Sequence, residues 1–344
     1  MPQRRGYAAG PTRNSASVEP VTTHFGGGSP VSKIVDRVLR STVKPVISVW
    51  SKAPDLPWPY AVVDYLGRPL TRVRGTTVRS IRLRNCNAEI VTPPGEAPVR
   101  TMLYLHGGAF LVGGRHLHRQ LISRIADITR SSVLAVDYRQ MPKHAVSTSV
   151  EDCVDAYRHL LSEGHAPEDI VIAGDSAGGY LTFMTAIVAI EEGLPAPAAL
   201  VALSPLTDLE MADKLGAPSS ETCSIFPRHT APALYGMYQA IETRSGSKRR
   251  TGSASPVDCD LHALPPTLIQ ASTTEMLYPD AMLMAQRLME AGVPVELQTW
   301  DGQAHVFQAG AGIMPEAAHA VANIGEFIER VMPVGAAADL RAIG

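Results

Sequence analysis

The feature that most constrains the fold of this chain is the motif Gly174-Asp175-Ser176-Ala177-Gly178-Gly179, which lies between two apolar runs. The run before it, residues 170–173, is typical of a buried strand, and the longer run after it, residues 180–190, predicts a buried helix. Where a strand turns at once into a helix, the two backbones nearly touch, so only glycine fits two residues to either side of the serine. The turn is therefore expected to strain the serine backbone and expose its hydroxyl.

A serine presented in this way is typical of a nucleophile, although a bare G-x-S-x-G motif also arises by chance. Its hydroxyl needs a base, the base needs an orienting acid, and in this arrangement the acid precedes the histidine along the chain. His305 follows the last predicted strand and is the candidate base. Glu275 and Asp280 both follow the predicted strand at 266–271. We favour Glu275 as the acid because it is closer to the strand end, while Asp280 remains the alternative, since a carboxylate is also expected where the next helix starts.

Acyl transfer further needs hydrogen-bond donors for the charge that develops on the carbonyl oxygen. The backbone N–H of Ala177, directly after the serine, is one candidate. The loop after the predicted strand at 101–105 begins with His106-Gly107-Gly108, where two glycines would let the backbone approach a substrate. We expect the N–H groups of Gly107 and Gly108 to complete an oxyanion hole, with the His106 side chain bracing the loop.

Strands and helices alternate along most of the chain, which is typical of a parallel, doubly wound sheet. Two alternating strands, residues 76–84 and 88–92, come first and are expected to form an antiparallel edge. The expected fold class is α/β, an α/β-hydrolase fold with a mostly parallel central sheet flanked by helices. The later predicted strands are 101–105, 132–138, 170–173, 199–204, 266–271 and 293–300, and the later predicted helices are 118–130, 149–163, 180–190, 278–291 and 315–331.

The alternation stops between residues 206 and 262, where only scattered helical pieces are predicted. An insertion after the carboxyl end of a strand lies on the ligand-binding face of such a sheet, so we expect it to form part of a helical cap. Helical spacing from Ser32, with Pro45 as a kink or a break, predicts the other part, and an ordinary core-packing helix is the alternative. The expected organisation is a flexible tail at 1–30, cap segments at 31–75 and 206–262, a core at 76–205 and 263–332, and a tail at 333–344.

Composition excludes several other classes of protein. A formal net charge of −2 gives no electrostatic argument for nucleic acid, and no apolar run is long enough to span a bilayer. No apolar stretch follows the basic N-terminus, so no signal peptide and a cytoplasmic location are expected. The four cysteines are widely spaced and are expected to be reduced, although a Cys223–Cys259 bridge is left open.

Two further signals are weak. His116 and His118 suggest a metal, but no third ligand is evident, and positions at the surface or the pocket rim are favoured. The basic run at 244–250 could attract anionic substrates or lipid headgroups, and a solvated cap loop is favoured instead.

The motifs together resemble the hormone-sensitive lipase family of esterases and lipases over roughly residues 75–330. The resemblance rests on His106-Gly107-Gly108-Ala109-Phe110, the 174–179 motif and His305-Val306-Phe307. It implies a capped α/β-hydrolase that hydrolyses carboxylic esters with short to medium acyl chains. It also implies Ser176 as nucleophile, His305 as base, and the N–H groups of Gly107, Gly108 and Ala177 as oxyanion donors.

The chain departs from the family pattern in two places near the site. Ala109 stands where many members have a third glycine, which should be tolerated because the donors are backbone groups. The acid is commonly an aspartate followed by Pro-Leu, whereas this chain has Glu275-Met276-Leu277. Some members do use a glutamate there, so Glu275 is kept as the acid.

The sequence thus predicts a serine carboxylesterase that works through an acyl-enzyme, needs no metal or cofactor, and acts on a small-molecule ester. A homodimer is left open. One alternative is an amide or formamide hydrolase, or a deacetylase of a specialised metabolite, which the same triad would serve. The other is a ligand-binding homologue without turnover, although such relatives typically lose the base or the nucleophile.

Overall fold

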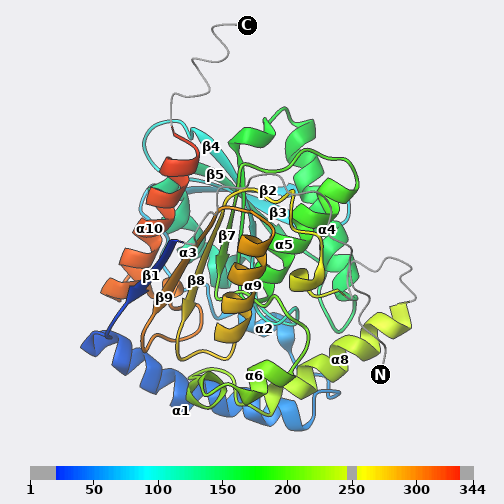
Figure 1. Cartoon of the computed structure of the whole chain (residues 1–344), viewed down its shortest axis with the longest axis vertical. Helices are drawn as coiled ribbons and strands as arrows, with labels where there is room; N and C mark the ends of the chain where they lie inside the picture. The colour runs from blue at the N-terminus through cyan, green and yellow to red at the C-terminus, as the bar shows by residue number, and fades with distance from the viewer. Residues whose placement is uncertain (1–20, 246–253, 334–344) are drawn as a thin grey trace, which may run out of the picture.

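The structure, a computed structural model, describes residues 21–245 and 254–333. In this part of the chain, nine strands form one sheet in the order β1-β9-β8-β7-β6-β4-β5-β3-β2 (Figure 1). The non-consecutive neighbours in that order are the crossovers that a doubly wound α/β sheet requires. The α/β-hydrolase fold expected from the sequence is therefore confirmed.

The elements have the following bounds. The strands are β1 (Val21–Phe25), β2 (Thr77–Arg82), β3 (Asn87–Thr92), β4 (Arg100–Leu105), β5 (Ser131–Asp137), β6 (Ile170–Asp175), β7 (Ala199–Leu203), β8 (Thr267–Ser272) and β9 (Val295–Trp300). The helices are α1 (Pro30–Lys52), α2 (Tyr60–Tyr65), α3 (Arg115–Thr129), α4 (Val146–Ser162), α5 (Ala177–Glu191), α6 (Ala212–Gly216), α7 (Ser219–Thr222), α8 (Thr230–Ser245), α9 (Tyr278–Glu290) and α10 (Pro315–Val331).

Pairing within the sheet follows the expected division. β2 pairs with β3, and β3 with β5, in antiparallel fashion, so the predicted antiparallel edge is confirmed. The remaining neighbours are parallel, and the central strands β4, β6, β7 and β8 are buried along their whole length. Helices cover both faces of a parallel sheet, which is why these strands are continuous apolar runs without alternation.

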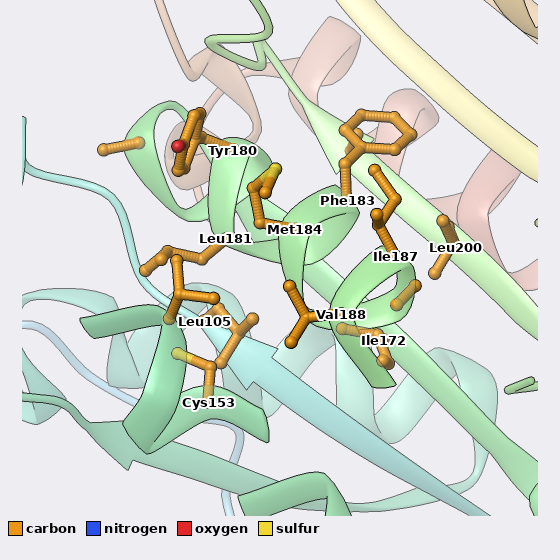
Figure 2. Packing of buried hydrophobic residues seen from close by; sticks show 14 of the residues in the cluster. Leu105, Cys153, Ile172, Tyr180, Leu181, Phe183, Met184, Ile187, Val188 and Leu200 are labelled. Carbon is orange, nitrogen blue, oxygen red and sulfur yellow. The ribbon is translucent and has the colours of Figure 1, made fainter. Parts of the chain in front are cut away.

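Helices pack on both faces of the sheet. α3 and α10 contact each other on one face, and α4 and α5 contact each other on the other. α5 is buried along nearly all of its length, which explains its lack of a polar face. Figure 2 shows Leu181, Met184 and Val188 of this helix packed among residues of β4, β6 and α4. The helix that follows the serine is thus a rigid central element.

The expected flexible tail at 1–30 is wrong for residues 21–25. They form β1, which pairs in parallel with β9 at the edge of the sheet. The ring of Phe25 stacks on that of Trp300 with centroids 3.9 Å apart, and a ring nitrogen of His24 is 3.0 Å from the Thr299 hydroxyl. The strand is short and largely polar, so its stability comes from these tertiary contacts rather than from its own pattern. Residues 1–20 and 334–344 of the two expected tails lie outside the described residues.

α1, α6 and α8 lie together at one end of the molecule, at the bottom of Figure 1. α1 continues through Pro45 as one helix, so the proline does not separate two shorter helices.

Most of the basic run at 244–250 lies outside the described residues. Across residues 21–245 and 254–333, no helix combines the length and the apolar character needed to cross a bilayer. The four cysteines are all free thiols, so the Cys223–Cys259 bridge left open by the sequence is not formed.

Candidate active site

Ser176 lies at the turn between β6 and α5, with φ +55° and ψ −119°. A non-glycine residue rarely takes such angles, so the turn is strained in the manner expected from the sequence. A Cβ on Gly178 would lie 1.9 Å from the carbonyl oxygen of Leu105, and one on Gly174 would lie 2.4 Å from that of Gly178. Only glycine can occupy these positions, because the strand and the helix pass too close for any side chain.

The structure brings Ser176, His305 and Glu275 into one hydrogen-bonded chain. The Ser176 hydroxyl oxygen is 2.9 Å from His305 Nε2, and His305 Nδ1 is 2.6 Å from Glu275 Oε2. The other carboxylate oxygen, Glu275 Oε1, accepts a 2.9 Å hydrogen bond from the Ser272 N–H. All three of the candidate catalytic side chains are buried, Glu275 completely. A carboxylate fixed at both oxygens holds the imidazole in one orientation, with Nε2 toward the serine.

Asp280, the alternative acid, faces away from His305. One carboxylate oxygen accepts hydrogen bonds from the N–H groups of Thr207 and Asp208, at 2.9 and 3.0 Å. The other is 2.8 Å from the ammonium of Lys214, which is itself buried. Burial outweighs these favourable contacts and raises the pKa of Asp280 to about 6. The geometry therefore favours Glu275 for the histidine and gives Asp280 the task of holding α6 and the 207–208 loop.

The loop after β4 lies against the serine. A Cβ on Gly107 would meet Asp175 Oδ2 at 2.2 Å and the Ser176 Cβ at 3.0 Å, and Gly108 has φ +118°. Among the described residues, no acceptor is found for the N–H groups of Gly107 and Gly108. Ala177 is the first residue of α5, where an N–H has no partner within the helix. These three N–H groups therefore have no hydrogen-bond acceptor among the described residues.

A second buried network lies directly behind the serine. Asp175 accepts a 2.8 Å hydrogen bond from the Tyr104 hydroxyl and lies 3.4 Å from His118 Nε2. Burial favours the neutral form of each group, but the attraction between them outweighs it, so the pKa of His118 is raised and that of Asp175 is lowered. The preference for a surface or rim position is therefore wrong for His118. Helix α3 directs the His118 side chain toward the protein interior, where the Asp175 carboxylate balances the charge of its ring.

The His106 side chain packs against the loop after β4 and supports it. Its ring stacks on Tyr138 with centroids 4.4 Å apart, and its Nδ1 lies 2.8 Å from the Gly107 carbonyl oxygen. The Tyr138 hydroxyl donates to the His106 carbonyl oxygen at 2.6 Å. Burial, together with the nearby His118, lowers the pKa of His106 to about 4. The ring is therefore neutral near pH 7, and it supports the loop without adding charge to it.

An apolar pocket opens beside the serine. Three stretches of chain that are distant in sequence form its walls: the 206–214 segment, α8 with the residues before it, and residues 276–277 after β8. Its lining residues include Phe110, Leu206, Leu209, Met211, Phe226, Leu234, Tyr235, Tyr238, Met276 and Leu277. An apolar cavity of this kind suits a hydrocarbon or aromatic group next to the reacting atoms.

Sequence reasoning missed Phe226 and Lys214 in this pocket. Phe226 lies edge-on to the His305 ring, with centroids 5.2 Å apart. Both residues fall in the irregular 206–262 stretch, where no periodicity indicates which side chains point inward. A buried lysine gives no signal of its own in a sequence, because lysine is nearly always exposed. A role for Asp175 could have been predicted, because this residue directly precedes the serine in the motif.

Comparisons with known proteins identify the family of this chain. The family model described as alpha/beta hydrolase fold matches residues 102–309. The chain is 40% identical to the esterase LipU of Mycobacterium tuberculosis over 83% of this chain and 98% of LipU. It is 38% identical to the carboxylesterase/phospholipase LipF of the same organism over 90% of this chain and 84% of LipF.

A solved structure extends the similarity to three dimensions. The crystal structure of an esterase from the bacterial hormone-sensitive lipase family superposes with a TM-score of 0.77 and 29% sequence identity. The match covers 89% of this chain and all of that one. The two proteins therefore share the same overall fold over most of this chain.

Proposed function

Because the chain belongs to the hormone-sensitive lipase family of α/β-hydrolases and is a carboxylesterase-type hydrolase, we propose that Ser176, His305 and Glu275 are its catalytic triad. The observation that carries the proposal is the unbroken chain of hydrogen bonds from the Ser176 hydroxyl through His305 to Glu275. A buried triad with this connectivity can activate a serine that is otherwise a weak nucleophile.

In the first half of the reaction, Ser176 Oγ attacks the ester carbonyl carbon while His305 Nε2 takes the hydroxyl proton. Glu275 holds the His305 ring in place and stabilises the imidazolium that forms. When the tetrahedral intermediate collapses, the bond to the alcohol oxygen breaks, and His305 returns the proton to the leaving alcohol. In the second half, water replaces the serine as nucleophile and releases the acid from the acyl-enzyme.

The negative charge on the former carbonyl oxygen needs donors that are already in place. We assign this role to the N–H groups of Gly107, Gly108 and Ala177. Their support comes from the tight packing of the loop on the turn and from the stacked, neutral His106 behind it. Loss of one such donor typically costs on the order of 10²–10³ in kcat.

The apolar pocket supports a short- to medium-chain acyl ester as the substrate class, because Phe226, Leu234 and Met276 are apolar and the Lys214 ammonium in the lining is already paired with Asp280. We also propose that α1 and α2, together with the 206–262 segment, form a cap over the site. α8 lines the pocket and contacts α1, which supports this assignment.

The test is hydrolysis of a series of p-nitrophenyl esters from acetate to palmitate, with Ser176→Ala as the inactive control. We expect a maximum among the short to medium chains and a loss of about 10⁴-fold or more in the control. Hydrolysis of the matching anilides, with no turnover of the esters, would favour an amide hydrolase instead. A folded protein that hydrolyses neither series would contradict the proposal.

A further inference from the structure

Helix α1 carries an apolar stripe that the other described residues, within 21–245 and 254–333, do not cover. In the order of the chain, Ile34, Val38, Val46 and Val49 expose 57%, 51%, 61% and 57% of their surface. At 100° per residue, Ile34, Val38 and Val49 fall within an arc of about 60°, and Val46 lies about 60° beyond it, so all four fall within about 120°. The opposite side of the helix is anchored on the protein, where Ser32 and Trp50 are buried. The helix therefore has more apolar surface than its own fold uses.

The same helix is strongly basic. It contains five basic residues and one acidic residue, a net charge of +4 in a chain whose net charge is −2. The whole 31–75 segment, with eight basic and three acidic residues, has a net charge of +5. Lys33, Arg37 and Lys52 are exposed, and none of these three forms an ion pair within the described part of the chain. Basic residues along an exposed apolar stripe are typical of helices that lie at a lipid surface.

We propose that α1 docks the protein on an anionic lipid surface, with its apolar stripe among the acyl chains and its basic residues at the headgroups. The opposite charge of the lipid supports this partner, since each lysine or arginine near such a surface adds about 1 kcal/mol of attraction. A second copy of this chain fits less well. A two-fold interface centred on α1 would place this basic helix against itself, with like charges opposed.

The position of α1 connects the docking surface to the pocket. In Figure 1 the helix lies along the outer edge of the molecule, and it contacts α8. The Lys44 ammonium donates to the Cys223 carbonyl oxygen at 2.6 Å, and the Ser48 hydroxyl is 3.0 Å from His229 Nε2. Phe226 lies between Cys223 and His229 in the chain, and it lines the pocket and contacts His305. Docking on α1 would bring this side of the pocket near the lipid, where apolar esters concentrate, a consequence that rests on the proposed function.

The test of docking itself does not depend on catalysis. The full chain with Ser176→Ala is sedimented with vesicles of phosphatidylglycerol and phosphatidylcholine, and with vesicles of phosphatidylcholine alone. We expect binding to the anionic vesicles that weakens as salt rises, because exposed charges are screened. The pair Ile34→Glu and Val38→Glu should reduce the bound-to-free ratio by about tenfold or more. The pair Lys33→Glu and Arg37→Glu should do the same while leaving the stripe intact.

The matched control is the pair Ile128→Glu and Met289→Glu, which adds the same two charges at residues exposed to 48% and 37% on α3 and α9. It should bind like the parent, and circular dichroism should show that every variant is folded. The proposal is overturned if the parent does not bind anionic vesicles, if it binds both vesicle types equally, or if the stripe variants bind as well as the parent. It is also overturned if the stripe variants instead dissolve a dimer seen by analytical ultracentrifugation without lipid.

A second readout separates docking from catalysis. With Ser176 restored, the stripe variants should hydrolyse water-soluble p-nitrophenyl butyrate at the parent rate and lose activity only on an ester carried in anionic vesicles. If the parent shows no esterase activity at all, the proposed function fails, while the vesicle binding of the Ser176→Ala protein still decides the docking surface.

Discussion

Two carboxylates near the end of β8 differ in what surrounds them, and those surroundings separate their roles. Glu275 meets an imidazole and one backbone N–H, so its charge supports the protonation of His305. Asp280 meets an ammonium and two backbone N–H groups, so its charge holds chain segments together. The sequence favoured Glu275 on its distance from the strand end. It could not show the partner of Asp280, because Lys214 lies 66 positions earlier in an irregular stretch.

This difference predicts opposite outcomes for two alanine substitutions. Glu275→Ala should lower kcat by about 10²–10⁴-fold and leave the protein folded, because it removes only the group that orients the base. Asp280→Ala should destabilise the protein by about 3–5 kcal/mol, since it leaves the Lys214 ammonium buried without its partner. Steady-state kinetics and urea unfolding of both variants provide the measurement. If Asp280→Ala abolishes turnover in a fully stable protein while Glu275→Ala remains active, the assignment of the acid is wrong.

Among the elements, the long apolar and amphipathic segments were predictable. The final helix was expected at 315–331, and α10 spans Pro315–Val331. The strand and the helix on either side of Ser176, β6 and α5, were also predicted, because buried elements have continuous apolar runs that leave little ambiguity. The inward turn of His118 on α3 was not predictable, because its partner Asp175 lies on another element and the pairing depends on how α3 packs against the sheet.

The His118–Asp175 pair predicts a pH-dependent stability that links α3 to the end of β6. Because the pKa of His118 is raised, its contribution is complete below the ordinary histidine pKa of about 6.5 and is lost as pH rises through the raised value. Because the pKa of Asp175 is lowered, its contribution is present above about 3.9 and is lost as pH falls through the lowered value. Together they stabilise the fold most between about pH 4 and 6.5.

His118→Gln tests this dependence, because glutamine can still donate to Asp175 but does not titrate. We expect the advantage of the parent over this variant, measured as the free energy of unfolding in urea, to be largest near pH 6 and to shrink toward pH 9. His165→Gln is the control on a less buried histidine, with no carboxylate partner among the described contacts. An advantage that stays constant from pH 6 to pH 9 would contradict the proposed ionisation of His118.

On the scale of the whole molecule, the sequence predicted the core sheet, which the structure confirms, while the triad and the cap remain proposals. It could not predict which residues of the 206–262 segment line the pocket, because α6, α7 and α8 are short or lack a clear apolar face. Nor did it indicate that the sheet continues to β1. That strand depends on a neighbour about 270 residues away, and no local pattern records such a contact.

The edge strand β1 leads to a last prediction. Phe25 stacks on Trp300, and the N–H of Asp301 donates to the Phe25 carbonyl oxygen at 2.9 Å, just before the loop that carries His305. Phe25→Ala should therefore lower the free energy of unfolding by about 1–2 kcal/mol, the sum of a lost aromatic pair and lost apolar burial. It should also lower kcat modestly, because the base is positioned from the end of β9. Thr22→Ala, an exposed residue of the same strand, is the control and should change neither quantity. Equal effects of the two substitutions on thermal unfolding and kcat would show that β1 contributes no side-chain anchor to the fold.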